Sequence, residues 1–315
     1  MLRMKSVAVS FGMAALLASP AAFAAEPDSC KTVHFADVGW TDITATTATA
    51  SVVLEALGYS PDVQVLSVPV TYTSLKNKDI DVFLGNWMPT MEADIKPYLE
   101  DKSVETVRVN LEGAKYTLAV PKYTFDEGLK TFADIAKFKD KLGNKIYGIE
   151  AGNDGNRLIL DMIEKNSFDL GGFELVESSE AGMLSAVQRA AGSKTDVVFL
   201  GWEPHPMNAN VEMAYLSGGD EVFGPNYGGA TVSTNVRAGY TSECANVGQF
   251  LKNLSFSLKM ENEIMGSILN DGADPEAAAT EWLKANPTVI DPWLQGVTTF
   301  DGGDATAAVK TALGI

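Results

Sequence analysis

Short apolar segments alternate with amphipathic segments along most of this chain, and this alternation restricts the possible folds more than any other feature. Strands are expected at 33–38, 63–70, 81–87, 114–122, 145–151, 173–178 and 195–202, and helices at 41–60, 71–78, 156–166 and 182–192. Alternating strands and helices indicate an α/β fold built on largely parallel sheets. Apolar residues make up 46% and charged residues 21% of the chain, which is typical of a globular protein.

The last third of the chain differs from the rest, because it is mostly helical after about residue 236. Such a tail cannot build a third sheet, so we expect it to complete the first of two lobes. The predicted first lobe is 25–113 plus 213–315, and the second is 114–212. The chain would cross between the lobes near 112–115 and near 207–225. Two lobes joined by two crossings form a cleft, which is a common place for a ligand.

The first 24 residues have the pattern of a secretory signal peptide. Arg3 and Lys5 precede an apolar run at 7–17, and the sequence Ala22-Phe23-Ala24 then matches an A-x-A cleavage site. We expect cleavage after Ala24 and export, and the style of the signal favours a Gram-negative periplasm. The alternative, a membrane anchor, is disfavoured because the run is too short to span a bilayer.

Charge and cysteine content restrict the partners of the exported chain. The formal net charge is −17, and loss of the leader with its two basic residues brings it to −19. Such an acidic chain is not expected to bind nucleic acid, and its field favours cations. Cys30 and Cys244 are the two cysteines, and an oxidising compartment favours one disulfide between them. Two buried thiols remain the alternative.

Three of the five tryptophans occupy the same kind of position. The phrase DVFLGNWMP contains Trp87, the phrase DVVFLGWEPH contains Trp202, and Trp40 follows a strand in VGWTD. Ligands of open α/β sheets bind at the carboxyl ends of strands, and a glycine before the tryptophan would let the backbone turn. We therefore expect these three side chains to face the cleft, while Trp282 and Trp293 in the helical tail serve packing. Aromatic faces on an acidic protein suit a quaternary ammonium ion, which has no N–H donor.

The segments VGWTD, GNWMP, AKYTL, EAGND and LGWEPH together resemble the choline-binding members of the glycine betaine and choline substrate-binding proteins of ABC importers. The resemblance covers nearly the whole chain from Cys30 onward. It implies a two-lobed periplasmic binding protein that closes on choline and delivers it to an ABC permease in the inner membrane. The Cys30–Cys244 pair also resembles the family pattern. We expect a monomer without cofactor or metal.

The same resemblance implies a set of ligand-binding residues. The aromatic cage would consist of Trp40 and Trp87 from the first lobe with Tyr116 and Trp202 from the second. Asp42 and Asn153 would contact the hydroxyl end of the ligand. From the residues alone, Asn153 and Asp42 are also candidates for capping the helices that follow them. The charge of Asp42 would favour choline over the carboxylate-bearing glycine betaine.

Two alternatives stay open from the sequence. The first is a protein for glycine betaine or for quaternary ammonium ions in general. The second is an exported enzyme acting on a quaternary amine, but only His34 and His205 are available, and no nucleophile elbow, H-E-x-x-H or phosphate loop occurs. His34 lies in a strand, whereas His205 follows Trp202 closely enough to approach the cleft.

Overall fold

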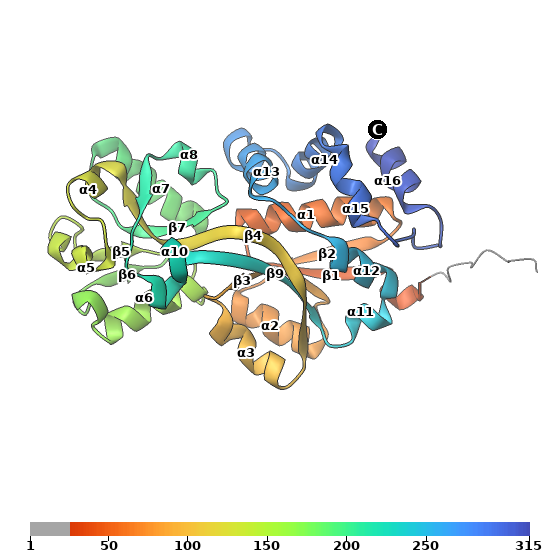
Figure 1. Ribbon diagram of the computed structural model, residues 1–315, viewed down its shortest axis with the longest axis horizontal. Coiled ribbons are helices and arrows are strands. Elements are labelled where there is room, and N and C mark those ends of the chain that lie inside the picture. Colours follow the sequence, from red (N-terminus) through yellow and green to blue (C-terminus); the bar gives the residue numbers. More distant parts are fainter. Residues whose placement is uncertain (1–25) are drawn as a thin grey trace, which may run out of the picture.

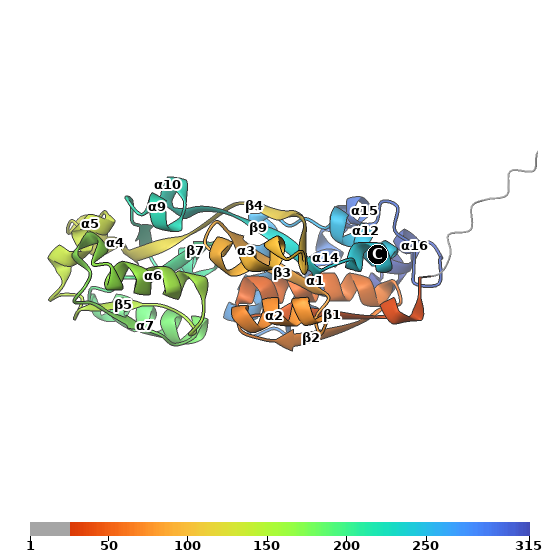
Figure 2. The same ribbon diagram turned by 90° about the horizontal axis from the view of Figure 1, so that it is seen from below.

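Two long antiparallel strands run from one lobe of the protein into the other and hold the molecule together (Figure 1). They are β4 (Val104–Pro121) and β9 (Gly229–Arg237) in a computed structural model that describes residues 26–315. The predicted leader therefore lies outside the described residues. Within 26–315, nine strands form one sheet in the order β2-β1-β3-β9-β4-β7-β5-β6, and β8 pairs with β4. The lobes lie end to end along the two long strands (Figure 2).

The first lobe combines the start and the end of the chain. Its parallel strands are β1 (Thr32–Asp37), β2 (Ser60–Val65) and β3 (Val82–Met88). Its helices from the first pass are α1 (Thr41–Ala56), α2 (Val68–Asn77) and α3 (Glu92–Glu100). The returning chain adds α11 (Tyr240–Glu243), α12 (Ala245–Asn253), α13 (Leu258–Asp271), α14 (Pro275–Ala285), α15 (Ile290–Trp293) and α16 (Ala305–Leu313). As expected, the helical tail packs on this lobe, where α13, α14 and α16 contact α1.

The second lobe lies between the two crossings. Its strands are β5 (Lys145–Tyr147), β6 (Glu174–Val176), β7 (Phe199–Glu203) and β8 (Met213–Tyr215). Its helices are α4 (Lys122–Asp126), α5 (Phe132–Ile135), α6 (Asp154–Glu164), α7 (Glu180–Ser193), α8 (Met207–Asn210), α9 (Asp220–Phe223) and α10 (Pro225–Gly228). Strands β5, β6 and β7 are parallel, whereas β7 and β8 both run antiparallel to β4.

The return crossing differs from its predicted place near 207–225 and from the lobe boundary at residue 213. Strand β8 pairs with β4 at Ala119–Pro121, inside the second lobe, and α9 contacts α6 while α10 contacts β4. The chain leaves this lobe only at Gly228 and Gly229, where β9 begins. We therefore propose 114–228 as the second lobe. Gly113 lies within the predicted first crossing at 112–115, and its φ of +77° lies in the left-handed region.

One predicted strand is too long, because a helix begins within the segment that was expected to be extended. The segment at 63–70 was expected to be extended throughout, but β2 ends at Val65 and α2 begins at Val68. Pro69 sits in the first turn of α2, where its missing N–H costs no helical hydrogen bond. The apolar run therefore belongs to two elements.

The structure joins Cys30 to Cys244 by a disulfide, with a Cα–Cα distance of 5.6 Å. The bond links the first described residues to the start of α12, across 214 positions of sequence. The predicted Cys30–Cys244 disulfide is therefore present, and it links the two chain segments that form the first lobe. No helix within 26–315 is both long and apolar enough to cross a membrane.

Candidate ligand-binding site

A small cavity lies between the two lobes, and aromatic side chains make up most of its lining. Its lining residues are Trp40, Asp42 and Trp87 from the first lobe, and Tyr116, Ile149, Asn153 and Trp202 from the second. Each of the seven is at most 5% exposed, so the cavity is closed off from solvent. The structure thus brings all six predicted ligand-binding residues together. Ile149, which no motif indicated, completes the wall.

The three tryptophans reach the cavity from the ends of strands, although only one follows its strand. Trp40 comes after β1, where Gly39 has a φ of +80° and turns the chain into α1. Trp87 lies within β3 and Trp202 lies within β7. The expected position at the carboxyl end of a strand is therefore observed, but two of the side chains project from the strand itself.

The glycines before Trp87 and Trp202 serve close packing instead of a turn, which corrects the expected reason for their presence. A Cβ atom on Gly85 would lie 2.7 Å from Ile43 Cδ1, and one on Gly201 would lie 2.9 Å from Ala119 Cβ. Such contacts are well inside van der Waals distance. Each strand therefore needs a glycine there to lie close to its neighbours and keep its tryptophan at the cavity.

Tyr116 sits at the centre of the aromatic wall. It is paired with Trp202 across the β4–β7 ladder, and their ring centroids are 6.2 Å apart in an edge-to-face arrangement. The ring of Trp87, from the other lobe, has its centroid 5.9 Å from that of Tyr116. Phe223 supports Tyr116 from behind with a centroid distance of 6.0 Å. These distances are typical of packed aromatic pairs.

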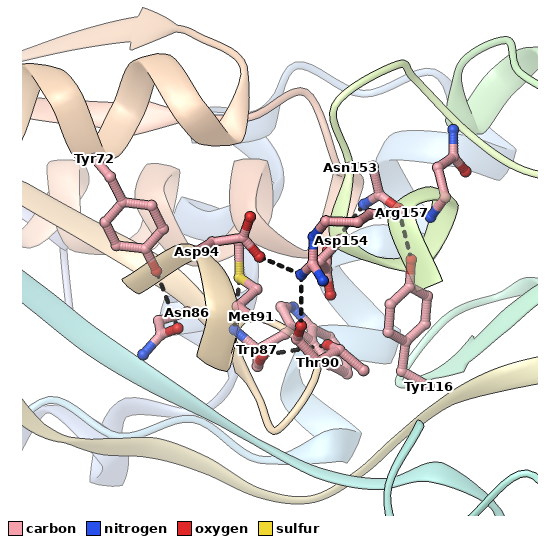
Figure 3. Close-up of polar contacts among 11 residues, drawn as sticks. Tyr72, Asn86, Trp87, Thr90, Met91, Asp94, Tyr116, Asn153, Asp154 and Arg157 are labelled. Carbon is pink, nitrogen blue, oxygen red and sulfur yellow. Dashed lines mark hydrogen bonds and ion pairs between the residues drawn. The ribbon is translucent and has the colours of Figure 1, made fainter. Parts of the chain in front are cut away.

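Polar partners fix the orientation of three of the four cage rings. Trp40 Nε1 donates to Glu150 Oε1 at 2.7 Å, and Trp87 Nε1 donates to Asp42 Oδ2 at 3.0 Å. The Tyr116 hydroxyl donates to Asn153 Oδ1 at 3.0 Å (Figure 3). Because these N–H and O–H groups are bonded within the protein, the ring faces are left for a ligand.

Asp42 presents an unpaired carboxylate oxygen at the cavity. Its Oδ2 accepts from Trp87, but its Oδ1 is buried and has no hydrogen-bond partner. Burial, together with the nearby Glu180 charge, raises the pKa of Asp42 to about 8. A buried carboxylate with a free lone pair is satisfied by a donor or a positive charge. Asp42 does not cap its helix as expected, because α1 begins at Thr41 and Trp40 is the N-cap residue.

Asn153 is held mainly by the protein. Its Oδ1 accepts from the backbone N–H of Asn156 at 3.0 Å, which makes it the N-cap of α6, and it accepts from Tyr116 as well. Its Nδ2 donates to Asp154 Oδ1 at 3.1 Å. The predicted capping role is therefore present, and Asn153 also lines the cavity.

A second set of contacts joins the lobes beside the cavity. Arg157 Nη2 on α6 donates to Asp94 Oδ2 on α3 at 2.6 Å and to the backbone oxygen of Thr90 at 3.0 Å (Figure 3). Asp154 lies in the same region and is fully buried, and its burial raises its pKa to about 7. These contacts close the cleft around the cavity.

The residues considered for catalysis or for packing lie elsewhere. His34 is partly exposed on β1 and contacts Asp62 at 2.9 Å, while His205 lies behind Trp202 and contacts Glu180. Trp293 is buried in the tail and donates to Ser255, in agreement with a packing role. Within residues 26–315, no group of three or more His, Cys, Asp or Glu side chains could hold a metal ion.

The arrangement suits a particular kind of ligand. Four aromatic rings and a carboxylate with one free oxygen surround the cavity, and no basic side chain lines it. Such a wall attracts a positive charge that is spread over apolar groups. The fold and the enclosed cavity between its lobes define a two-lobed ligand-binding protein.

Comparison with known proteins identifies the family. Residues 31–285 match the family OpuAC, described as the substrate-binding domain of an ABC-type glycine betaine transport system, and the chain belongs to this family. Its members are substrate-binding transport proteins and not enzymes.

Three individual proteins are similar to this chain. The structure of an ABC-transporter choline-binding protein in complex with choline is 74% identical, with a TM-score of 0.90, and covers 91% of this chain and 100% of its own. An unliganded semi-closed structure of an ABC-transporter choline-binding protein, also 74% identical with the same coverage, has a TM-score of 0.84. The glycine betaine/carnitine transport binding protein GbuC of Listeria monocytogenes is 31% identical over 165 residues, which span 52% of this chain and 54% of that protein.

Proposed function

We propose that this protein captures choline between its two lobes in the periplasm and delivers it to an ABC permease of the inner membrane. The observation that carries the proposal is the enclosed cavity whose walls are Trp40, Trp87, Tyr116 and Trp202 and whose one free polar atom is Asp42 Oδ1. The relative that was solved with choline supports the same ligand at 74% identity.

The aromatic cage would bind the trimethylammonium group. Each cation–π contact contributes roughly 0.5–2 kcal/mol, so four contribute about 2–8 kcal/mol. Micromolar binding corresponds to about 8 kcal/mol, and burial of the methyl groups adds to the contacts while association entropy opposes them. A cage of this size is therefore sufficient for useful affinity.

Asp42 would accept the hydroxyl of choline and would offset its positive charge. The same carboxylate would repel the carboxylate of glycine betaine, and the lining residues include no lysine or arginine to receive it. Lys115, the one basic residue in the motifs, contacts Glu203 at 3.3 Å and does not line the cavity. Asn153 would orient Tyr116 and would have little capacity left for the ligand, because its amide atoms are bonded within the protein.

Several parts of the proposal rest on the sequence. The leader at 1–24, with cleavage after Ala24, supports export, and the family supports a permease partner. We propose a monomer that closes on its ligand, because the ligand would contact both lobes only in the closed form.

The second candidate ligand is glycine betaine, which the family description names. Calorimetric titration with choline, acetylcholine, glycine betaine and carnitine separates the candidates. The proposal requires choline to bind most tightly, whereas glycine betaine binding as tightly as choline would exclude the assigned role of Asp42.

A further inference from the structure

The helix that carries Trp40 and Asp42 begins without a cap of its own. Trp40 occupies the N-cap position of α1, and its side chain makes no capping hydrogen bond. The first N–H groups of any helix have no partner within the helix and need one from elsewhere. The first turn of α1 is also buried, since Asp42 and Ile43 are at most 2% exposed.

Glu180 of the second lobe supplies that partner across the cleft. Its Oε2 accepts from the backbone N–H of Thr41 at 2.9 Å, and its Oε1 accepts from Thr41 Oγ1 at 2.5 Å. Glu180 is the first residue of α7 and is only 4% exposed. A carboxylate at a helix N-terminus is favoured both by the free N–H groups and by the helix dipole.

His205 holds Glu180 in place from the side of the second lobe. Its Nε2 lies 3.1 Å from Glu180 Oε1, and its Nδ1 accepts from the backbone N–H of Met207 at 2.9 Å. Because Nδ1 acts as an acceptor, the ring proton is assigned to Nε2, which donates to Glu180. The His205 ring also packs edge-on against Trp202 with a centroid distance of 4.8 Å. The contacts therefore connect cage residues of both lobes.

Glu150 makes a parallel contact one residue away, where it accepts from Trp40 Nε1 at 2.7 Å. Two carboxylates of the second lobe thus bind Trp40 and Thr41, the residues at which α1 begins. In each hydrogen bond the two residues are more than 100 positions apart in the sequence, and they lie on opposite sides of the cleft.

We infer that Glu180 is a positioning residue, which caps α1 only when the lobes are closed and thereby couples closure to the placement of Trp40 and Asp42. When the lobes separate, the Thr41 N–H exchanges the carboxylate for water. These contacts therefore stabilise only the closed form. The same movement assembles the aromatic cage, so stabilising the closed form increases the affinity for the ligand. The link to choline rests on the proposed function, whereas the link to closure does not.

The test compares Glu180→Gln with Glu164→Gln, an exposed glutamate on α6 of the same lobe that serves as the matched control. Charge-assisted hydrogen bonds are roughly twice as strong as neutral ones. We expect Glu180→Gln to bind choline about 10- to 100-fold more weakly, through faster dissociation with an association rate within about twofold of wild type. Thr41→Val should weaken binding as well, and the double variant should lose less than the product of the two effects. The melting temperature of the ligand-free protein should not change.

Closure of the ligand-free protein gives a second readout, measured by energy transfer between one fluorophore on each lobe. Loss of a cap lowers the closed fraction of Glu180→Gln. Removal of the Glu180 charge would by itself raise the closed fraction, because that charge opposes ionisation of Asp42 in the closed form. An unchanged or higher closed fraction, or choline binding equal to the control, overturns the inference. If wild type binds no choline, the proposed function fails, and the closed fraction alone decides the role of Glu180.

Discussion

Replacing Asp42 by asparagine removes the only carboxylate among the seven lining residues and keeps the shape of the side chain. The new amide oxygen can still accept from Trp87 Nε1, which lies 3.0 Å from Asp42 Oδ2. The amide NH₂ group then replaces Oδ1, the buried oxygen that has no partner in the protein. A donor would thus face the ligand where an acceptor now does.

The expected change differs in sign between two ligands. Choline loses an acceptor for its hydroxyl, and a hydrogen bond to a charged group contributes about 1.5–3 kcal/mol, which corresponds to an affinity loss of about 10- to 150-fold. Glycine betaine loses a like-charge repulsion and gains a donor for its carboxylate, so its affinity should hold or increase. The preference for choline should therefore fall at least about tenfold.

Isothermal titration calorimetry at pH 7 with both ligands measures the two affinities directly. Asp79→Asn is the matched control, because Asp79 is exposed on the first lobe and its substitution removes the same charge from the surface. The control separates a local effect from a change in net charge. Choline binding that is equally tight in Asp42→Asn and in the control would refute the role assigned to Asp42.

Three more predictions follow from the site and the fold. Trp202→Ala should weaken choline binding by about 30-fold or more, since it removes a desolvated cation–π contact of about 2 kcal/mol, whereas Asn153→Ala should cost less than about tenfold; comparable small losses in calorimetry would place Trp202 outside the site. Because the pKa of Asp42 is raised to about 8 in the closed, empty form, protonation stabilises that form at low pH, and this contribution is lost as pH rises through about 8. The closed fraction of ligand-free protein, followed by energy transfer, should therefore fall between about pH 4 and pH 8, and Asp42→Asn should reduce that dependence. Replacing Cys30 and Cys244 by serine should lower the free energy of unfolding by about 2–5 kcal/mol in urea titrations, with choline affinity within about twofold of wild type; a large loss of affinity would contradict the placement of the bond away from the cleft.

The sequence was informative where function depends on local context. Trp40, Trp87 and Trp202 each stand near the end of an apolar strand, and the rule for ligands of α/β sheets places such residues at the cleft. The structure confirms the two-lobed α/β fold and brings these side chains to one cavity. Tyr116 could not be chosen from local pattern alone, because one tyrosine in a strand is usually a packing residue, and only the family resemblance indicated it.

The sequence was uninformative where the site depends on contacts between lobes. Glu150 and Glu180 lie 110 and 139 positions from the residues that they bind. Glu150 begins the motif EAGND, but nothing in that motif indicates a contact with Trp40, and Glu180 stands in none of the motifs. The predicted lobe boundary at residue 213 differs from the place where the chain re-enters the first lobe for a related reason. Strand β8 pairs with β4, and the two strands are far apart in the sequence. The role of Gly85 and Gly201 in close packing depends on Ile43 of α1 and Ala119 of β4, which no local sequence pattern places beside them.

The most direct test of the account is the affinity of the unmodified protein for choline and for glycine betaine, measured by calorimetry under the same conditions. We predict that choline binds at least about tenfold more tightly, because Asp42 Oδ1, which has no partner in the protein, would accept its hydroxyl and would repel a carboxylate. Glycine betaine binding as tightly as choline, or more tightly, would contradict the account.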